Sequence, residues 1–250
     1  MAQQRTEEWL ENYNEEYFDR QFKNPYRSTV LICDWLEKLA ILDSSSKQFV
    51  IDIATGKGAN LVYFNQRFPG CSFLGLDLSK HFVDEGNKYL AKNEIASCRL
   101  EQGNLYEINK DKYQRPQGIT CLQTISWLPD FEQPLKNFFS LSPEWILLSS
   151  LFYEGNVNCK LEIEQYEKSF DSKPRKSFYN IYSIPLVEKF CEENGYRVKF
   201  IPFEIDIDIP NTNHGIMGTY TEKLLNGKRL QFSGPLLMNW YFIILQKRSK

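Results

Sequence analysis

Short apolar runs alternate with helical patterns through most of the chain. The apolar runs lie at 49–53, 72–76, 98–101, 118–122 and 145–151. The helical patterns, in which apolar residues recur every three or four positions, lie at 58–67, 79–92, 130–140 and 184–194. Strands that are apolar on both faces are typical of a parallel sheet covered by crossover helices. The pattern therefore predicts an α/β fold.

The two ends of the chain differ from this alternation. Aromatic and apolar residues at helical spacing predict a helix over 7–22, and a second helix is expected over 28–39. Residues 1–47 are therefore expected to form an N-terminal helical cap on a domain that spans 48–250. Near the other end, the alternation of apolar and acidic residues at 203–209 predicts a strand with one face in water.

Two long segments do not match the length of standard loops in an α/β fold. They cover about 152–183 and 210–235. Connections of this length inside a domain are usually lids or binding loops, so we expect substrate-binding insertions there. The Asn226-Gly227 pair predicts a hairpin within 216–245.

Composition and charge exclude several classes of protein. The chain has 250 residues, 42% of them hydrophobic and 15% aromatic, which is too apolar for a disordered chain. Thirty basic residues oppose 32 acidic ones, so no global field would hold nucleic acid or an anionic membrane. Six scattered cysteines and two histidines show neither a disulfide framework nor metal-ligand spacing.

Neither a leader nor a membrane-spanning run is visible in the sequence. The acidic N-terminus lacks an apolar core, and the apolar run at 240–245 is too short to cross a bilayer. We therefore expect a cytoplasmic protein that contacts neither membrane nor nucleic acid. The sequence does not indicate an oligomeric state.

The most informative stretch runs from a buried strand through a small-residue turn into a helix. Its residues 49–60 read FVIDIATGKGAN. Small residues at Ala54, Gly56 and Gly58 let a ligand approach the backbone and the free N–H groups of the helix that follows. Asp52 would repel a pyrophosphate, and the G-x-G-x-x-G dinucleotide fingerprint fails at Leu61. The loop therefore fits a ligand other than a dinucleotide.

Polar residues also end the next two strands. Asp77 follows the second apolar run, where an acid can accept hydrogen bonds from both hydroxyls of a ribose. Asn104 and Leu105 follow the third, where an amide can pair with an adenine edge. Each of these acids and glycines has a second interpretation, because Asp52 or Asp77 can cap a helix and glycines can mark turns. Their joint order favours a crevice for an adenosyl group.

This arrangement resembles class I S-adenosylmethionine-dependent methyltransferases. The similarity covers roughly 48–200, in the order hhDhAxGxG at 50–58, hhGhD at 73–77, GN at 103–104, then ITCLQ and TISWLPDFEQPLKNF. It implies a Rossmann-like doubly wound sheet, mostly parallel with an antiparallel last strand and helices on both faces. It also implies S-adenosylmethionine as the cofactor.

The resemblance assigns a role to each matching position. Around the methionine portion it places Asp52, Ala54, Gly56 and Gly58. Around the ribose and adenine it places Asp77, Leu78, Asn104 and Leu105. On the methyl side it places Gln123 and Thr124. Ala54 replaces the usual first glycine, and Asn104 stands where aspartate is common; both changes are mild.

Candidate residues for the acceptor side are less specific. His214, in the long loop, is a candidate general base or substrate contact, or else a surface histidine. Candidate stacking surfaces for a substrate are Trp127, Tyr153, Tyr179 and Tyr182, although core packing explains any one of them equally well.

The expected reaction is methyl transfer to a small-molecule acceptor. A resemblance to bacterial enzymes of surface-polysaccharide pathways implies a hydroxyl of a sugar or nucleotide-linked precursor. The segment after the fourth strand reads QTISW and lacks the N/D-P-P-Y motif expected of a nucleic-acid methyltransferase. An N-methyltransferase, an S-adenosylmethionine-binding protein without transfer activity and a nicotinamide-dependent enzyme are the alternatives.

Overall fold

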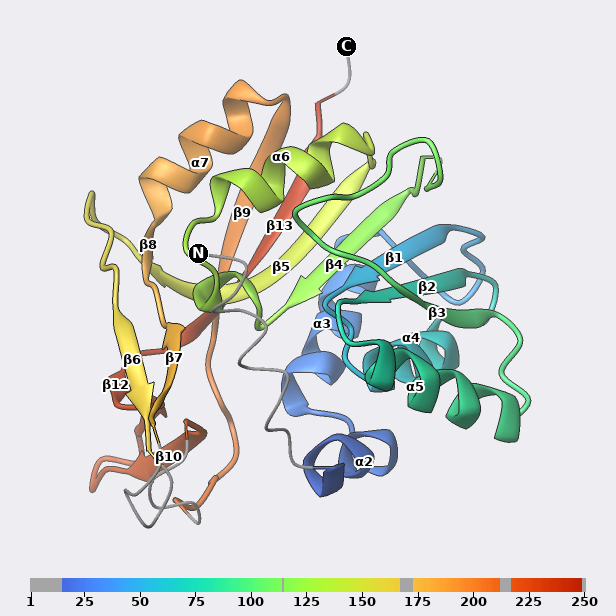
Figure 1. The fold of residues 1–250 in the computed structure, drawn as a ribbon. Coiled ribbons are helices and arrows are strands. Elements are labelled where there is room, and N and C mark those ends of the chain that lie inside the picture. The colour runs from blue at the N-terminus through green and yellow to red at the C-terminus, as the bar shows by residue number, and fades with distance from the viewer. Residues whose placement is uncertain (1–14, 114, 167–172, 212–216, 249–250) are drawn as a thin grey trace.

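A twisted sheet forms the centre of the molecule (Figure 1). The computed structural model describes residues 15–113, 115–166, 173–211 and 217–248. The strand order is β3-β2-β1-β4-β5-β13-β9, with a short β8 paired to the end of β5. These strands are β1 (Phe49–Ile53), β2 (Ser72–Asp77), β3 (Cys98–Gln102), β4 (Gly118–Leu122), β5 (Trp145–Tyr153), β8 (Tyr182–Ser183), β9 (Tyr196–Phe203) and β13 (Trp240–Lys247). The predicted α/β sheet is confirmed.

Helices cover both faces of this sheet, as the sequence predicts (Figure 1). One face carries α3 (Arg27–Lys38), α4 (Ala59–Arg67) and α5 (Lys80–Lys92), and the other carries α6 (Glu132–Ser140) and α7 (Ile184–Glu193). Successive strand residues point to opposite faces, so Val50 joins the core under α3 and α4 while Ile51 joins the core under α6. This two-sided burial explains why the strands are apolar throughout.

The two halves of the sheet differ in direction. Strands β1 to β5 run parallel to one another. Strand β13 lies between β5 and β9 and is antiparallel to both. The expected antiparallel last strand is thus confirmed.

The strand expected at 203–209 is wrong. Strand β9 ends at Phe203, which pairs with Trp240 at the start of β13. Beyond Phe203 the chain has no strand of the main sheet to pair with, and it turns toward the C-terminal hairpin. There the Ile209 N–H donates to Thr221 Oγ1 at 2.8 Å. The alternation of apolar and acidic residues indicated a half-exposed segment, but a strand also needs a neighbouring strand to pair with.

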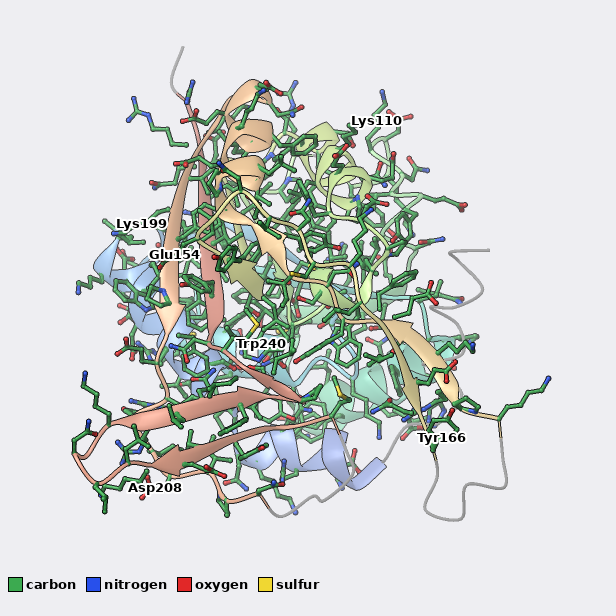
Figure 2. The ribbon with its side chains drawn as sticks, turned by 90° about the vertical axis from the view of Figure 1, so that its left-hand side faces the viewer. Lys110, Glu154, Tyr166, Lys199, Asp208 and Trp240 are labelled. Carbon is green, nitrogen blue, oxygen red and sulfur yellow. The ribbon has the colours of Figure 1, made fainter. Side chains whose placement is uncertain are left out.

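Both predicted insertions contain hairpins that lie outside the main sheet. The first holds β6 (Glu162–Gln165) and β7 (Arg175–Phe178), and the second holds β10 (Thr219–Lys223) and β11 (Arg229–Ser233) followed by β12 (Leu236–Leu237). The Asn226-Gly227 turn joins β10 to β11, with Gly227 at a φ of 82°. This hairpin forms its own small sheet, whereas the antiparallel strands of the main sheet are β9 and β13. Figure 2 shows Tyr166 at the tip of the β6–β7 hairpin and Asp208 beside the small sheet.

The two described helices before β1 pack on the side of the sheet that carries α4. Here α2 (Glu15–Lys23) contacts α4, and Phe22 stacks on Tyr89 of α5 at a centroid distance of 3.8 Å. Helix α3 buries Ile32, Cys33 and Leu36 in the same core. In the described part of the chain, no helix has the length and apolar character needed to cross a membrane.

Candidate active site

A pocket opens where the parallel strands end. Its walls come from the turns after β1, β2, β3 and β4, from α2 and α3 on one side, and from β7 on the other. The described residues that line it are Gln21, Tyr26, Ser28, Thr29, Ile53, Ala54, Thr55, Gly56, Asn60, Leu76, Asp77, Leu78, Phe82, Gly103, Asn104, Leu105, Tyr106, Leu122, Gln123, Thr124, Trp127, Leu128 and Ser177. Such a crevice at the carboxyl edge is where open α/β sheets bind ligands.

The turn after β1 has left-handed backbone at three positions. The φ angles are 59° at Ala54, 60° at Gly56 and 82° at Gly58. Glycine adopts this conformation freely, whereas alanine pays about 1–2 kcal/mol, so Ala54 holds local strain of the kind found at functional sites. Ala54 and Gly56 line the pocket as expected, while Gly58 begins α4 and packs against Leu100.

A glycine in β2 lets this turn lie against the sheet. A Cβ added to Gly75 would come within 2.6 Å of Thr55 Cγ2 and 2.9 Å of Leu61 Cδ1. The Thr55 N–H donates to the Leu76 carbonyl at 3.2 Å. The glycine of the hhGhD motif is therefore needed for close packing between the turn and β2.

Asp52 supports the turn from below and does not line the pocket. The side chain is buried, and its two oxygens accept hydrogen bonds from Thr55 Oγ1 at 2.7 Å and Thr120 Oγ1 at 2.6 Å. Burial raises the pKa of Asp52 to about 6 against the effect of these hydrogen bonds. These hydrogen bonds hold Thr55 to β4, and the contact with the methionine portion implied for Asp52 stays a prediction.

Asp77 lines the pocket with two of its hydrogen-bonding positions occupied. Its Oδ2 accepts from the Gly56 N–H at 2.8 Å, and its Oδ1 accepts from the Ser79 N–H at 2.9 Å. A carboxylate offers about four acceptor positions, so about two are left for the hydroxyls of a ribose. Burial raises the pKa of Asp77 to about 6, although the backbone hydrogen bonds oppose this shift. The residue fits the role implied for it, and it also orders the start of α5.

Three predicted adenine contacts line the same pocket. Leu78 after β2 and Leu105 after β3 supply apolar surface, and Asn104 lies beside Leu105 in the turn after β3. Asn104 Oδ1 accepts a hydrogen bond from the Tyr106 N–H at 2.9 Å. An amide oxygen has two lone pairs, so one remains for an adenine amino group. The structure thus shows a second task for Asn104, which is to hold the turn after β3.

The end of β4 also carries strained backbone. Gln123 has a φ of 55°, and its N–H is held by the carbonyl and Oγ of Ser149, at 3.0 and 2.8 Å. Thr124 Oγ1 donates to the Leu122 carbonyl at 2.9 Å. Both residues line the pocket, where the resemblance places the methyl side. A fixed turn here suits a site that must hold two reactants in one geometry.

The four candidate stacking residues have four different surroundings. Trp127 lines the pocket, and Tyr179 packs behind it with ring centroids 4.8 Å apart. Tyr182 is buried away from the pocket and donates to the Leu128 carbonyl at 3.1 Å. Tyr153 is half exposed and belongs to a separate depression beside Tyr241. Among the four, Trp127 alone offers a face to this pocket, since the others are core, support or surface residues.

The N-terminal helices α2 and α3 close one side of the pocket. The sequence alone did not decide this placement. Tyr26 and Thr29 line it, and Thr29 Oγ1 donates to Asn60 Oδ1 at 2.8 Å. The buried Lys57 Nζ in the glycine turn pairs with Asp19 of α2 at 2.8 Å. These contacts tie α2 and α3 to the turn that they cover. His214 lies outside the described residues.

A buried asparagine fixes the β6–β7 hairpin to the end of β4. The Asn180 N–H donates to the Ser126 carbonyl at 2.7 Å, and its Nδ2 donates to the Leu128 carbonyl at 2.8 Å. Its Oδ1 accepts from the Leu161 N–H at 3.0 Å. No motif marks Asn180 in the sequence, because its hydrogen-bonding partners meet it only once the chain is folded.

The raised pKa of Asp77 predicts how ligand binding depends on pH. A protonated carboxyl loses acceptor positions for the ribose and its attraction for a cationic ligand. The ionised form is depleted as pH falls through about 6, so the dissociation constant for S-adenosylmethionine should be flat above about pH 7 and rise below about pH 6.

Calorimetry across this range, in two buffers of different ionisation enthalpy, checks the prediction. We expect proton release on binding near pH 6, because the bound cation favours the ionised carboxylate. Affinity that stays constant down to about pH 5, with no buffer dependence, would exclude a titrating Asp77 from the binding site.

Comparison with known proteins identifies the central part of the chain. Residues 50–142 match a family model described as a methyltransferase domain. The trans-aconitate 2-methyltransferase of Escherichia coli (strain 55989 / EAEC) is 23% identical over 171 residues, which cover 66% of this chain and 65% of that enzyme. An uncharacterized protein of Rickettsia prowazekii matches over 31% of its own length. The chain therefore spans less than two thirds of the length of these curated relatives.

Solved structures share the whole architecture at low sequence identity. The YcgJ protein from Bacillus subtilis superposes with a TM-score of 0.59 at 13% identity, covering 90% of this chain and 100% of that one. Magnesium protoporphyrin IX methyltransferase from Synechocystis, solved with bound S-adenosylmethionine, gives a TM-score of 0.54 at 12% identity, covering 89% of this chain and 79% of that one. At such identities the likeness establishes the fold. Residues 50–142, which match the methyltransferase-domain model, lie within this shared Rossmann-like fold.

Proposed function

We propose that this chain transfers a methyl group from S-adenosylmethionine to a small, neutral, hydroxyl-bearing acceptor. One observation carries the proposal. The glycine turn, Asp77 and Asn104 line the same pocket as Trp127 and Ser177, so an adenosyl site and an acceptor site are continuous. The family match supports the methyl donor, and the chemistry of the lining supports the class of acceptor.

The residues present fit an adenosyl sulfonium. Asp77 keeps acceptor positions for the ribose, Leu78 and Leu105 flank a flat apolar space, and Asn104 keeps a lone pair for an amino group. When bound, the sulfonium supplies an electrophilic methyl group. The protein then has to hold the nucleophile close to that methyl and in line with it, and to keep water out. Gln123, Thr124 and Trp127 are the residues placed to shape that space.

The charge of the lining selects among acceptors. Among the described residues that line the pocket, Asp77 is the one charged side chain. A polycarboxylate such as the compound named for the E. coli relative would find no described cation there and would meet a carboxylate. A sugar hydroxyl beside Trp127 fits this lining, because sugar rings have apolar faces that pack on aromatic rings. The phosphates of a nucleotide-linked precursor would need a cation, and that cation would have to come from outside the described lining.

A hydroxyl acceptor also needs a group that takes its proton. Among the described lining residues there is no histidine or lysine. We propose His214, from the long loop of the second insertion, for this task. An aliphatic hydroxyl is far too weak an acid to ionise alone at neutral pH, so a positioned base is required.

Two measurements in sequence test the proposed function. Calorimetry first asks whether the chain binds S-adenosylhomocysteine. A product assay then follows methyl transfer to simple methyl glycosides, with trans-aconitate as the anionic comparison and His214→Asn as the variant that should lose turnover while keeping cofactor affinity. Binding without transfer to any acceptor would favour a binding protein, and turnover on trans-aconitate alone would contradict a neutral acceptor.

A further inference from the structure

Ser177 carries a buried hydroxyl that is left without a partner. The residue lies in β7, is 7% exposed and lines the pocket. In the described structure its Oγ makes no hydrogen bond. Buried hydroxyls in proteins nearly always have a partner, because an unpaired one costs desolvation free energy without return. The unpaired Ser177 hydroxyl therefore destabilises the folded protein at the wall of the pocket.

The surroundings of Ser177 place it at the acceptor end of the pocket. Strand β7 packs against the short 3-10 turn η1 (Ile125–Trp127) that follows β4. Tyr179, two positions after Ser177 and directly beyond the end of β7, packs behind Trp127. The residues that fit the ribose and adenine come instead from the turns after β2 and β3. Ser177 thus faces the part of the pocket that the adenosyl group does not need.

Contacts on both sides hold the backbone of β7 in place. Asn180, three residues later, ties the strand to η1 through the carbonyls of Ser126 and Leu128. On the other side of the hairpin, Ser177 pairs in register with Ile163 of β6. The backbone position of Ser177 is therefore fixed by contacts to both neighbours.

We infer that Ser177 Oγ is a hydrogen-bonding partner of the methyl acceptor and selects a neutral, oxygen-bearing ring compound that packs on Trp127. The inference rests on the proposed function and adds to it a specificity residue. A serine hydroxyl both donates and accepts, so it matches a sugar hydroxyl in either direction. Ser177 positions the acceptor and takes no part in proton transfer, since a hydroxyl is neither acidic nor basic enough near neutral pH.

The stability of the free protein gives the first arm of the test, and it requires no acceptor. Ser177→Ala removes an unpaired hydroxyl and should raise the melting temperature by about 2–4 °C. The matched control is Ser183→Ala, which is also buried but whose Oγ accepts from the Leu186 N–H at the start of α7. Loss of this cap should lower the melting temperature by a similar amount. A lower melting temperature for Ser177→Ala would show a structural partner and overturn the inference.

Steady-state kinetics and calorimetry give the second arm. With the methyl glycoside that the wild-type protein uses best, Ser177→Ala should raise KM about tenfold, the effect of losing one hydrogen bond of about 1.4 kcal/mol, and leave the affinity for S-adenosylhomocysteine unchanged. Ser177→Thr, which keeps the hydroxyl, should recover part of the loss. If S-adenosylhomocysteine binds but the KM of Ser177→Ala equals that of the wild type, the inference fails while the proposed function stands. If the wild type binds no S-adenosylhomocysteine, the proposed function itself fails, and the stability arm still decides whether the hydroxyl is unpaired.

Discussion

Replacing Asp77 with asparagine is expected to weaken binding of S-adenosylhomocysteine by about 10- to 100-fold. The carboxylate lines the pocket and keeps acceptor positions beyond those used by Gly56 and Ser79. Hydrogen bonds to a charged group contribute about 1.5–3 kcal/mol, and an amide offers one oxygen where the acid offers two. Asparagine still accepts from one backbone N–H, so the turn should survive.

Isothermal calorimetry measures this effect against a matched control. Asp84→Asn removes a carboxylate from the exposed surface of the neighbouring helix, where it pairs with Lys80, and its dissociation constant should stay within about twofold of the wild type. Thermal unfolding of both variants separates loss of binding from loss of fold. An Asp77→Asn protein that is folded and binds as tightly as the wild type would place the ribose elsewhere.

Replacing Asn180 with alanine should destabilise the protein by about 2–4 kcal/mol. The side chain is fully buried, and its loss leaves the Leu161 N–H without its partner and removes one of the two hydrogen bonds to the Leu128 carbonyl, which keeps the Tyr182 hydroxyl. Each buried group left unpaired costs about 1–3 kcal/mol. The backbone N–H of residue 180 still donates to the Ser126 carbonyl, but the β6–β7 hairpin is held less firmly, so we also expect the KM for the acceptor to rise more than the dissociation constant for S-adenosylhomocysteine.

Urea denaturation gives the free energy of unfolding for this comparison. The control is Asn194→Ala, at the exposed end of α7, where the amide donates to the Phe190 carbonyl. This change should lower the free energy of unfolding by less than about 0.5 kcal/mol. Equal stability of the two variants would show that Asn180 does not anchor the hairpin.

The parallel half of the sheet could be predicted because each element carries its own signal. Strands buried on both faces are apolar in sequence, and the crossover helices show the helical period. The turns after these strands end at one edge of the sheet by topology, so Asp77 and Asn104 could be expected to meet there. Their roles toward a ligand remain predictions that the proposed experiments test.

Other parts of the site depend on contacts between distant segments. Asp52 faces inward because Thr120 meets it from a strand that lies far along the chain, which no local pattern reveals. Tyr153, Tyr179 and Tyr182 share one residue type but differ in burial, since the path of the first insertion decides which of them faces inward. Ser177 carried no motif. The available signal was the spacing of two between Ser177 in β7 and Tyr179 directly after it, both buried, and it requires knowing that the segment is a strand.

The central claim is that the carboxyl edge of the sheet binds the adenosyl group. A crystal structure of the chain with S-adenosylhomocysteine tests this claim most directly. We expect the ribose hydroxyls within hydrogen-bond distance of Asp77, about 2.5–3.0 Å, with the sulfur toward Gln123 and Thr124. The ligand bound at another surface, or bound here with its ribose turned away from Asp77, would contradict the claim.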